Sequence, residues 1–168
     1  MIPEIDFLKR IYIFQDLTSQ EIDLIARIII PHEVSAGEIV MKEGEGGDVM
    51  YIIAEGEVQV YKALTMKFGD DDFRETEKTL TVLQADDNVV IGEMSLITEE
   101  KRSATITALT DVTLYRINRG DFFELGQANP ELGFKVTLRL AELVSKRLKK
   151  SDDDVIRLTT ALSIALSQ

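Results

Sequence analysis

Between residues 32 and 117 the sequence is a series of short β-branched runs separated by turn residues, and this feature constrains the fold more than any other. Glycine, aspartate or asparagine stands between most of the runs. Short strands that alternate with such turns are typical of β-sandwiches and small barrels. The sequence therefore predicts about eight strands, at 34, 39–41, 49–53, 58–61, 79–83, 89–91, 103–109 and 112–117.

A helical pattern precedes the β unit. Thr18 and Glu21 have the spacing of a capping box, in which each side chain accepts a hydrogen bond from a backbone N–H group at the helix start. Apolar residues then recur at helical spacing from Ile22 to Ile29. Pro31 is expected to end this helix, because the residue before a proline is disfavoured in the helical conformation.

Helical patterns return after the β unit. Asn129-Pro130 is a cap followed by proline at the first helical position, and an apolar stripe runs from Phe134 to Leu148. The basic residues at 146–150 are expected to complement the C-terminus of that helix, and Ser151 is expected to cap a further helix. The predicted organisation is an N-terminal helical segment at 1–31, a β unit at 32–117 and C-terminal helices at 118–168.

Composition excludes several classes of function. The chain of 168 residues has no cysteine and one histidine, His32, which excludes disulfides, thiolate zinc sites and multi-histidine metal sites. Its formal charge of −11 disfavours nucleic-acid binding. The longest apolar run, at 28–30, is far too short for a membrane helix, and no signal peptide is apparent. We therefore expect a cytoplasmic domain that binds neither membrane nor DNA.

Residues 91–106 combine a glycine, a carboxylate and an arginine. Gly92 permits close backbone approach, and Glu93 is expected to begin a short helical turn whose N–H groups would attract an anion. Arg102 adds a guanidinium that matches phosphate geometry and stays protonated. A carboxylate beside an anion site suits a sugar hydroxyl, so the segment fits a ribose joined to a singly charged phosphate. Composition alone equally allows a structural ion pair between Glu93 and Arg102.

The same residues resemble the phosphate-binding cassette of the cyclic nucleotide-binding domain family. The family pattern is Gly-Glu-(Leu/Met)-(Ala/Ser)-Leu, a spacer, and then Arg-(Ala/Ser/Thr)-Ala-(Thr/Ser). This chain has Gly-Glu-Met-Ser-Leu at 92–96 and Arg-Ser-Ala-Thr at 102–105. The spacing resembles that of kinase-regulatory members and is one residue shorter than in the bacterial catabolite activator. Similar turns at 36–44 and 51–58 extend the resemblance over nearly all of 7–150.

The resemblance implies a fold and a set of ligand contacts. The fold would be an eight-stranded β jelly roll, or double-stranded β-helix, with an N-terminal helix and C-terminal helices. Glu93 would accept a hydrogen bond from the ribose 2′-hydroxyl, and Arg102 would bind the exocyclic phosphate together with Ser103. In related domains threonine at the position of Ser103 favours the guanine nucleotide, so serine favours cAMP over cGMP. The full implied set is Gly92, Glu93, Met94, Ser95, Arg102, Ser103 and Ala104, with no catalytic residue, metal or further cofactor.

Three departures from the family pattern leave these contacts in place. Ile91 replaces the usual aromatic residue, Lys101 replaces the usual proline, and Ala-Asp-Asp-Asn at 85–88 replaces a common glycine. None of them removes a side chain that would contact the ligand. The added acids lower the expected affinity for an anion.

The predicted function is a cyclic-nucleotide sensor in which binding changes the packing of the helix after Pro130. In the family this helix packs over the ligand or forms a dimer seam, so the partner would be an unknown protein or a second copy bound through 130–168. Only eighteen residues follow Lys150, so no DNA-binding output is expected on this chain. The alternative is a scaffold or dimerisation protein that keeps the fold without a ligand. An enzyme on a related jelly roll would want clustered histidine and carboxylate ligands, which this chain lacks.

Two features leave alternatives open. Ser151 could approach the base of the ligand, by comparison with the catabolite activator, although capping of the last helix is favoured. The 62–78 segment, with three aspartates at 70–72, allows disorder, a lengthened hairpin or a partner-binding excursion.

Overall fold

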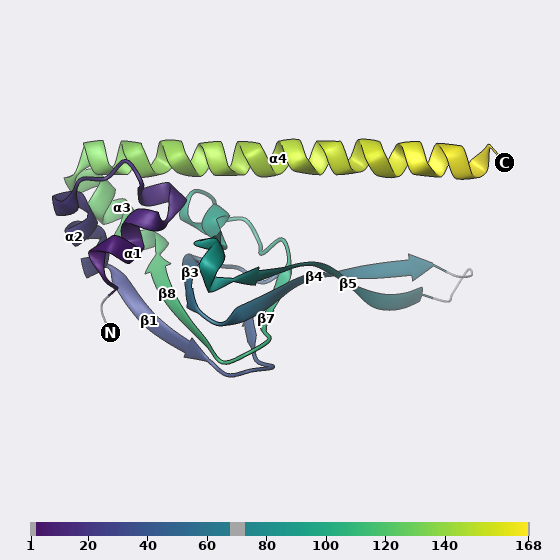
Figure 1. The fold of residues 1–168 in the computed structure, drawn as a ribbon, viewed down its shortest axis with the longest axis horizontal. Coiled ribbons are helices and arrows are strands. Elements are labelled where there is room, and N and C mark those ends of the chain that lie inside the picture. Colours follow the sequence, from purple (N-terminus) through teal and green to yellow (C-terminus); the bar gives the residue numbers. More distant parts are fainter. Residues whose placement is uncertain (1–2, 68–72, 168) are drawn as a thin grey trace.

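The computed structural model describes residues 3–67 and 73–167. Eight strands form two four-stranded antiparallel sheets, in the orders β1-β8-β3-β6 and β2-β7-β4-β5. This arrangement, shown in Figure 1, confirms the predicted eight-stranded jelly roll with helices on either side in the sequence. The strands are β1 (Ile29–Val34), β2 (Ile39–Met41), β3 (Val49–Glu55), β4 (Glu57–Lys67), β5 (Phe73–Gln84), β6 (Val90–Ile91), β7 (Thr105–Ala108) and β8 (Val112–Asn118).

The N-terminal helices confirm the capping box predicted at Thr18 and correct the helix end predicted at Pro31. The capping box of Thr18 and Glu21 is present and starts the helix α2. That helix stops at Arg27, and Pro31 lies within β1, where it is paired with Tyr115. β1 is an edge strand, so the missing N–H of proline removes no interior hydrogen bond. The helical elements are α1 (Ile5–Arg10), η1 (Tyr12–Phe14), α2 (Ser19–Arg27), η2 (Ala85–Asp87), η3 (Glu93–Leu96), α3 (Arg119–Ala128) and α4 (Pro130–Leu166).

Two hydrophobic cores hold the described residues together. One core lies between the two sheets and includes Val34, Ile53, Val58 and Leu114. The other joins the first sheet to the helices and includes Leu8, Phe14, Ile22, Ile25, Met50, Ile117, Leu132, Val136 and Leu140. At the start of α4 a Cβ added at Gly133 would lie 3.1 Å from the Cα atom of Gly126, so these glycines let α3 and α4 pack closely.

The chain from Pro130 to Leu166 is one continuous helix, which corrects the prediction that a further helix starts at Ser151. α4 runs over 37 residues from Pro130, at the expected first position, to Leu166. Ser151 lies inside it and caps nothing, and the basic residues at 146–150 lie in its middle. No glycine or proline follows Gly133 in the sequence, so nothing interrupts the helix where the capping pattern suggested a boundary.

The β4–β5 hairpin is the lengthened hairpin among the alternatives for 62–78. The two strands are paired from Glu57↔Gln84 out to Lys67↔Phe73. Aspartates 70–72 lie outside the described residues. In Figure 1 this hairpin and the C-terminal half of α4 extend from the β unit in the same direction.

Candidate functional site

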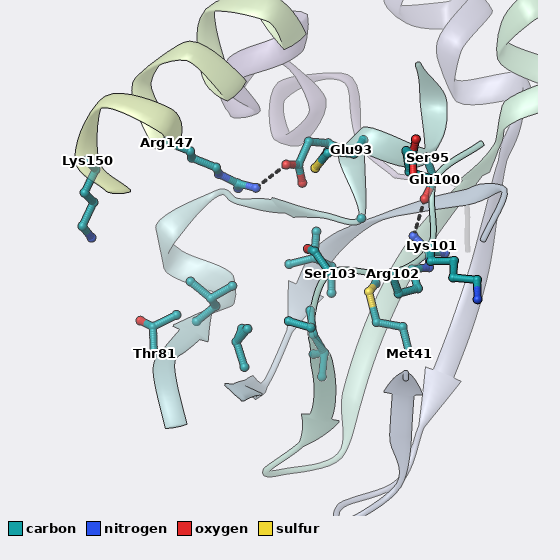
Figure 2. A pocket seen from close by; sticks show the side chains of 17 residues that line it. Met41, Thr81, Glu93, Ser95, Glu100, Lys101, Arg102, Ser103, Arg147 and Lys150 are labelled. Atoms are coloured by element: carbon teal, nitrogen blue, oxygen red, sulfur yellow. Dashed lines mark hydrogen bonds and ion pairs between the residues drawn. The ribbon is translucent and has the colours of Figure 1, made fainter. Parts of the chain in front are cut away.

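A pocket of about 330 Å³ lies between the cassette, the base of the β4–β5 hairpin and α4. Figure 2 shows Arg102 and Ser95 on one side of it, and Glu93 on the side facing α4. Glu93 is the first residue of η3, which follows Gly92 in the left-handed conformation at φ 67°. The predicted short helical turn therefore exists, and Glu93 at its start lines the same pocket as Arg102, which lies in the loop that follows the turn.

Arg102 is held in place by hydrogen bonds and by two glycines. Its Nη1 donates to Ser95 Oγ at 2.6 Å, and its Nη2 donates to the carbonyl oxygen of Val49 at 2.8 Å. A Cβ at either Gly47 or Gly92 would overlap the guanidinium group. The arginine fork is therefore oriented before any ligand arrives, which reduces the entropy lost on binding an anion.

The electrostatics of Arg102 reflect its half-buried position. Burial lowers the pKa of its guanidinium from the usual value, while Tyr51, Asp48 and Glu93 act in the opposite direction. The lowering favours an anionic partner, because a charge removed from water gains most from a direct counter-ion.

The glycine-rich turn at 44–48 supports Arg102. Gly44 adopts a φ of 82°, and its N–H donates to the carbonyl oxygen of Arg102 at 2.9 Å. The N–H of Arg102 donates in turn to the carbonyl oxygen of Glu45 at 2.8 Å. These two hydrogen bonds hold the backbone of Arg102 against the turn.

Glu93 is buried, and α4 supplies its charged partner. Glu93 is only 4% exposed, and Arg147 Nη1 donates to Glu93 Oε1 at 2.5 Å. Arg147 Nη2 also donates to the carbonyl oxygen of Val90 at 3.1 Å. Figure 2 shows Arg147 reaching from the helix toward the carboxylate. The predicted alternative of an ion pair between Glu93 and Arg102 is replaced by one that joins the cassette to the C-terminal helix.

All seven residues predicted from the cassette line this one pocket, namely Gly92, Glu93, Met94, Ser95, Arg102, Ser103 and Ala104. Sequence reasoning missed the contributions of α4, because it assigned the basic residues to a helix end. Val136, Leu140, Leu143 and Arg147 follow one another at spacings of four, three and four, so Arg147 continues the stripe that faces the domain. This spacing could have predicted that Arg147 faces the domain.

The pocket is positive although the chain is acidic. Four cationic side chains line it, Lys101, Arg102, Arg147 and Lys150, against the carboxylates Glu93 and Glu100. Ser151, which the sequence analysis considered near the base, is not among the lining residues, and Lys150 is. The remaining wall is largely apolar and is formed by Met41, Val60, Leu83, Ile91 and Ile106. The site thus offers cations for a phosphate and apolar surface for a ring.

The part of the chain that is described contains neither a cluster of metal-ligating side chains nor a helix suited to cross a membrane. Within residues 3–67 and 73–167 no three histidine or acidic side chains gather as they would around a metal ion. His32 lies in β1, with its ring centroid 5.9 Å from that of Tyr51. Across the same residues no helix is both long and apolar enough to cross a bilayer.

Comparison with known proteins decides the family. Residues 31–129, more than half of the chain, match the family model of the cyclic nucleotide-binding domain. The chain belongs to this family. A cyclic nucleotide-gated potassium channel of Rhizobium etli is similar to this chain, with 33% identity over 121 residues. That match covers 71% of this chain and 29% of the channel.

A second relative is similar over more of the chain. The cyclic AMP receptor protein of Thermus thermophilus is 29% identical over 140 residues, which cover 83% of this chain and 58% of the relative. The chain therefore spans between 29% and 58% of the length of these two curated relatives.

Solved structures agree with the family. The catabolite activator protein of Thermus thermophilus superposes with a TM-score of 0.72 at 28% identity, covering 88% of this chain and 62% of the other. A cyclic nucleotide-binding domain from Methylobacillus flagellatus superposes with a TM-score of 0.73 at 26% identity, covering 90% and 80% of the two chains. The jelly roll and its flanking helices are thus those of known members.

Proposed function

We propose that this protein is a sensor of a cyclic nucleotide, with cAMP favoured over cGMP, and that it carries out no catalysis. The observation that carries the proposal is that the buried Glu93 and the pre-oriented Arg102 lie on different sides of the same pocket. Glu93 accepts from the ribose 2′-hydroxyl, and Arg102 with Ser103 binds the cyclic phosphate. Gly92, Met94, Ser95 and Ala104 complete the contacts.

The chemistry of the pocket supports a nucleotide. Small-molecule pockets of roughly 300–1,000 Å³ are typically apolar with a few convergent polar groups, and this one has about 330 Å³. The apolar wall suits a base and ribose, and the excess of cations suits a phosphate that carries one negative charge. The exposed hydroxyl of Ser103, in place of threonine, is what favours cAMP.

The contact between Arg147 and Glu93 suggests how binding reaches α4. Arg147 donates to Oε1 of the same carboxylate that would accept from the ribose hydroxyl, and we propose that the two donors compete for it. Because Arg147 lies on α4, weakening of this ion pair changes the packing of that helix. Ligand and helix are therefore coupled through a single carboxylate.

The wider organisation follows from this coupling. We propose that 1–31, 32–117 and 118–168 act as helical support, nucleotide-binding unit and output, in the cytoplasm. The output partner is a second copy bound through α4, with an unidentified protein as the alternative. A ligand-free scaffold is less well supported, because a fold kept only as a scaffold needs neither a pre-oriented Arg102 nor an excess of cations in the pocket.

The proposal is tested by calorimetric titration of cAMP and cGMP into the wild type and Arg102→Ala. We expect saturable binding, tighter for cAMP, and a loss of roughly 100-fold in the variant because a charge-assisted contact of about 3 kcal/mol disappears. Arg27→Ala is the matched control, since Arg27 is exposed on α2 and remote from the cassette in sequence. Absence of wild-type binding to either nucleotide at millimolar concentration would refute the proposal.

A further inference from the structure

A second pocket, of about 500 Å³, lies between the end of η3, α3 and the start of α4. We call it the apolar pocket. Among the described residues, none lines both this pocket and the one that holds Glu93 and Arg102. Leu96, at the end of η3, lines the apolar pocket, whereas Glu93 and Ser95 of the same short helix line the other. The two pockets are therefore separate neighbours.

Two helices supply most of the lining of the apolar pocket. α3 contributes Phe122, Phe123 and Gln127, and α4 contributes Phe134 and Thr137. In Figure 1 α3 lies beneath the start of α4, which is the place where these side chains meet. The lining of α4 extends from residue 130 to residue 137, about 10 Å along the helix axis. This length suits a compact molecule better than the helix of a partner protein.

The apolar pocket has a buried floor and an exposed rim. Leu96 and Phe122 are almost fully buried and form the floor. Ile97, Phe123 and Phe134 stand at the rim with 39%, 45% and 67% of their surface exposed. A molecule that enters the pocket covers apolar surface that now faces water, and removal of such surface from water drives association.

The charges around the two pockets differ, and this difference limits what each can bind. In the described part of the chain no charged side chain lines the apolar pocket, whereas four cations line the other. A charged group in the apolar pocket would lose its hydration without gaining a counter-ion, which is costly. The apolar pocket therefore favours a neutral molecule and disfavours a nucleotide phosphate.

Two polar side chains of the apolar pocket are available to a ligand. Neither the hydroxyl of Thr137 nor the amide of Gln127 has a hydrogen-bond partner among the residues that the structure describes. Thr159 and Thr160 on the same helix behave differently, because each donates to the carbonyl oxygen four residues earlier at 2.8 Å. A few convergent polar groups in an apolar wall are typical of small-molecule sites, in which they orient the ligand.

We infer that the apolar pocket binds a neutral aromatic molecule that carries a hydrogen-bonding group. Phe122, Phe123 and Phe134 can pack against an aromatic ring, and Thr137 with Gln127 can bond to its polar group. The volume of about 500 Å³ lies within the range of known ligand sites. This second site goes beyond the proposed function and does not depend on nucleotide binding.

Nile red tests the inference, because it is a neutral aromatic dye with a carbonyl acceptor, and its fluorescence rises in apolar surroundings. Titration of the full chain should show one dye molecule per chain with a dissociation constant on the order of 10 µM. Thr137→Trp should weaken dye binding by roughly 10-fold or more, because the indole occupies the space that the dye needs. Thr160→Trp is the matched control, since Thr160 is also exposed on α4 but lines neither pocket, and it should bind as the wild type does.

A second variant separates a specific site from adsorption to apolar surface. Thr137→Val keeps the shape of the side chain and removes its hydroxyl, so it should weaken dye binding about 2- to 10-fold. Adsorption would leave the affinity unchanged or increase it, and either result would overturn the inference. Wild-type binding in Thr137→Trp would overturn it as well.

The remaining controls identify which pocket holds the dye and whether another molecule covers it. Arg102→Ala should bind the dye as the wild type does, because Arg102 lines only the other pocket. Dye binding and nucleotide binding can therefore fail independently of each other. A dye affinity that falls as the protein concentration rises would mean that a second copy of the chain covers the apolar pocket, and would overturn the inference.

Discussion

The two halves of α4 both carry an apolar pattern at helical spacing, but their surroundings are very different. In the first half Leu132, Val136 and Leu140 are buried against the N-terminal helices. In the second half, from Leu148 on, no side chain is buried in the described structure. Both halves carry apolar residues at helical spacing, so the difference comes from what the rest of the chain presents to each half.

Polar contacts follow the same division. Ionic or hydrogen-bonded links join the first half to the N-terminal segment: Arg139 to Asp16 at 2.6 Å, Tyr12 to Glu142 at 2.7 Å, Lys135 to Glu21 at 2.9 Å and Lys146 to Tyr12 at 2.9 Å. Arg147, at the boundary, bonds to Glu93 and to the carbonyl oxygen of Val90, and Lys150 lines the same pocket. The comparison teaches that an amphipathic pattern predicts a packed face without saying which molecule packs on it.

Truncation of one aliphatic side chain in each half is expected to show the largest difference in the free energy of unfolding. Leu140→Ala should lower the free energy of unfolding by about 2–5 kcal/mol, because it leaves a cavity in a fully buried site. The corresponding change Ile164→Ala, on the exposed half, should alter it by less than about 0.5 kcal/mol. Urea unfolding followed by circular dichroism measures both. Equal losses would show that the C-terminal half packs on its own domain.

Removal of Arg147, at the boundary between the two halves, is expected to have a smaller effect, which appears in nucleotide binding. Arg147→Ala should tighten nucleotide binding roughly 2- to 10-fold, because an ion pair worth about 0.5–1.5 kcal/mol no longer has to be rearranged. Calorimetry with cAMP measures this, and Lys149→Ala, at an exposed position two residues further along α4, is the control. Weaker binding in Arg147→Ala would mean that the arginine contacts the nucleotide and closes over it.

Acid is expected to loosen the first half selectively and by a smaller amount. A hydrogen bond from Arg139 lowers the pKa of Asp16, and one from Tyr12 lowers that of Glu142 despite opposing burial. The pKa of Glu21 is lowered as well: burial opposes the change, but hydrogen bonds from Thr18 and Lys135 outweigh it. Carboxylates with lowered folded pKa values stabilise the fold fully above their unfolded values, from 3.8 to 4.5, and lose that contribution as the pH falls through the folded values.

The measurement is the urea midpoint between pH 7 and pH 3 for the wild type and Asp16→Asn. The wild type should lose stability more steeply below pH 4.5, since the variant lacks one of the three titrating links. Asp153→Asn, in the exposed half, serves as the control and should follow the wild-type curve. A wild-type midpoint independent of pH over this range would contradict the assignment of these links.

Much of the β unit and the cassette could be predicted from sequence, because both depend on local patterns. Alternating β runs fixed the number of strands, and the cassette residues line one pocket as expected. The predicted end of α2 at Pro31 was wrong, because a proline is tolerated in an edge strand as well as after a helix. The division of α4 was wrong because Ser151 and its aspartates resemble a cap, although no helix-breaking residue accompanies them.

The parts of the site that sequence could not give depend on long-range packing. Arg147 is 54 positions from Glu93, and nothing local links the two. Gly47 resembles an ordinary turn glycine, and only the folded chain shows that its missing side chain makes room for Arg102. Distant contacts of this kind become visible only when the helix direction and the turn geometry are both known.

The unbroken course of α4 also has a mechanical consequence. A helix with no glycine or proline after Gly133 has no joint at which to bend, so it moves as a lever. From Arg147 to Leu166 the lever arm is about 28 Å long at a rise of 1.5 Å per residue. A tilt of about 10° at the pocket would therefore displace the far end by about 5 Å. A rearrangement the size of one ion pair could thus be amplified into a movement as large as a helical turn.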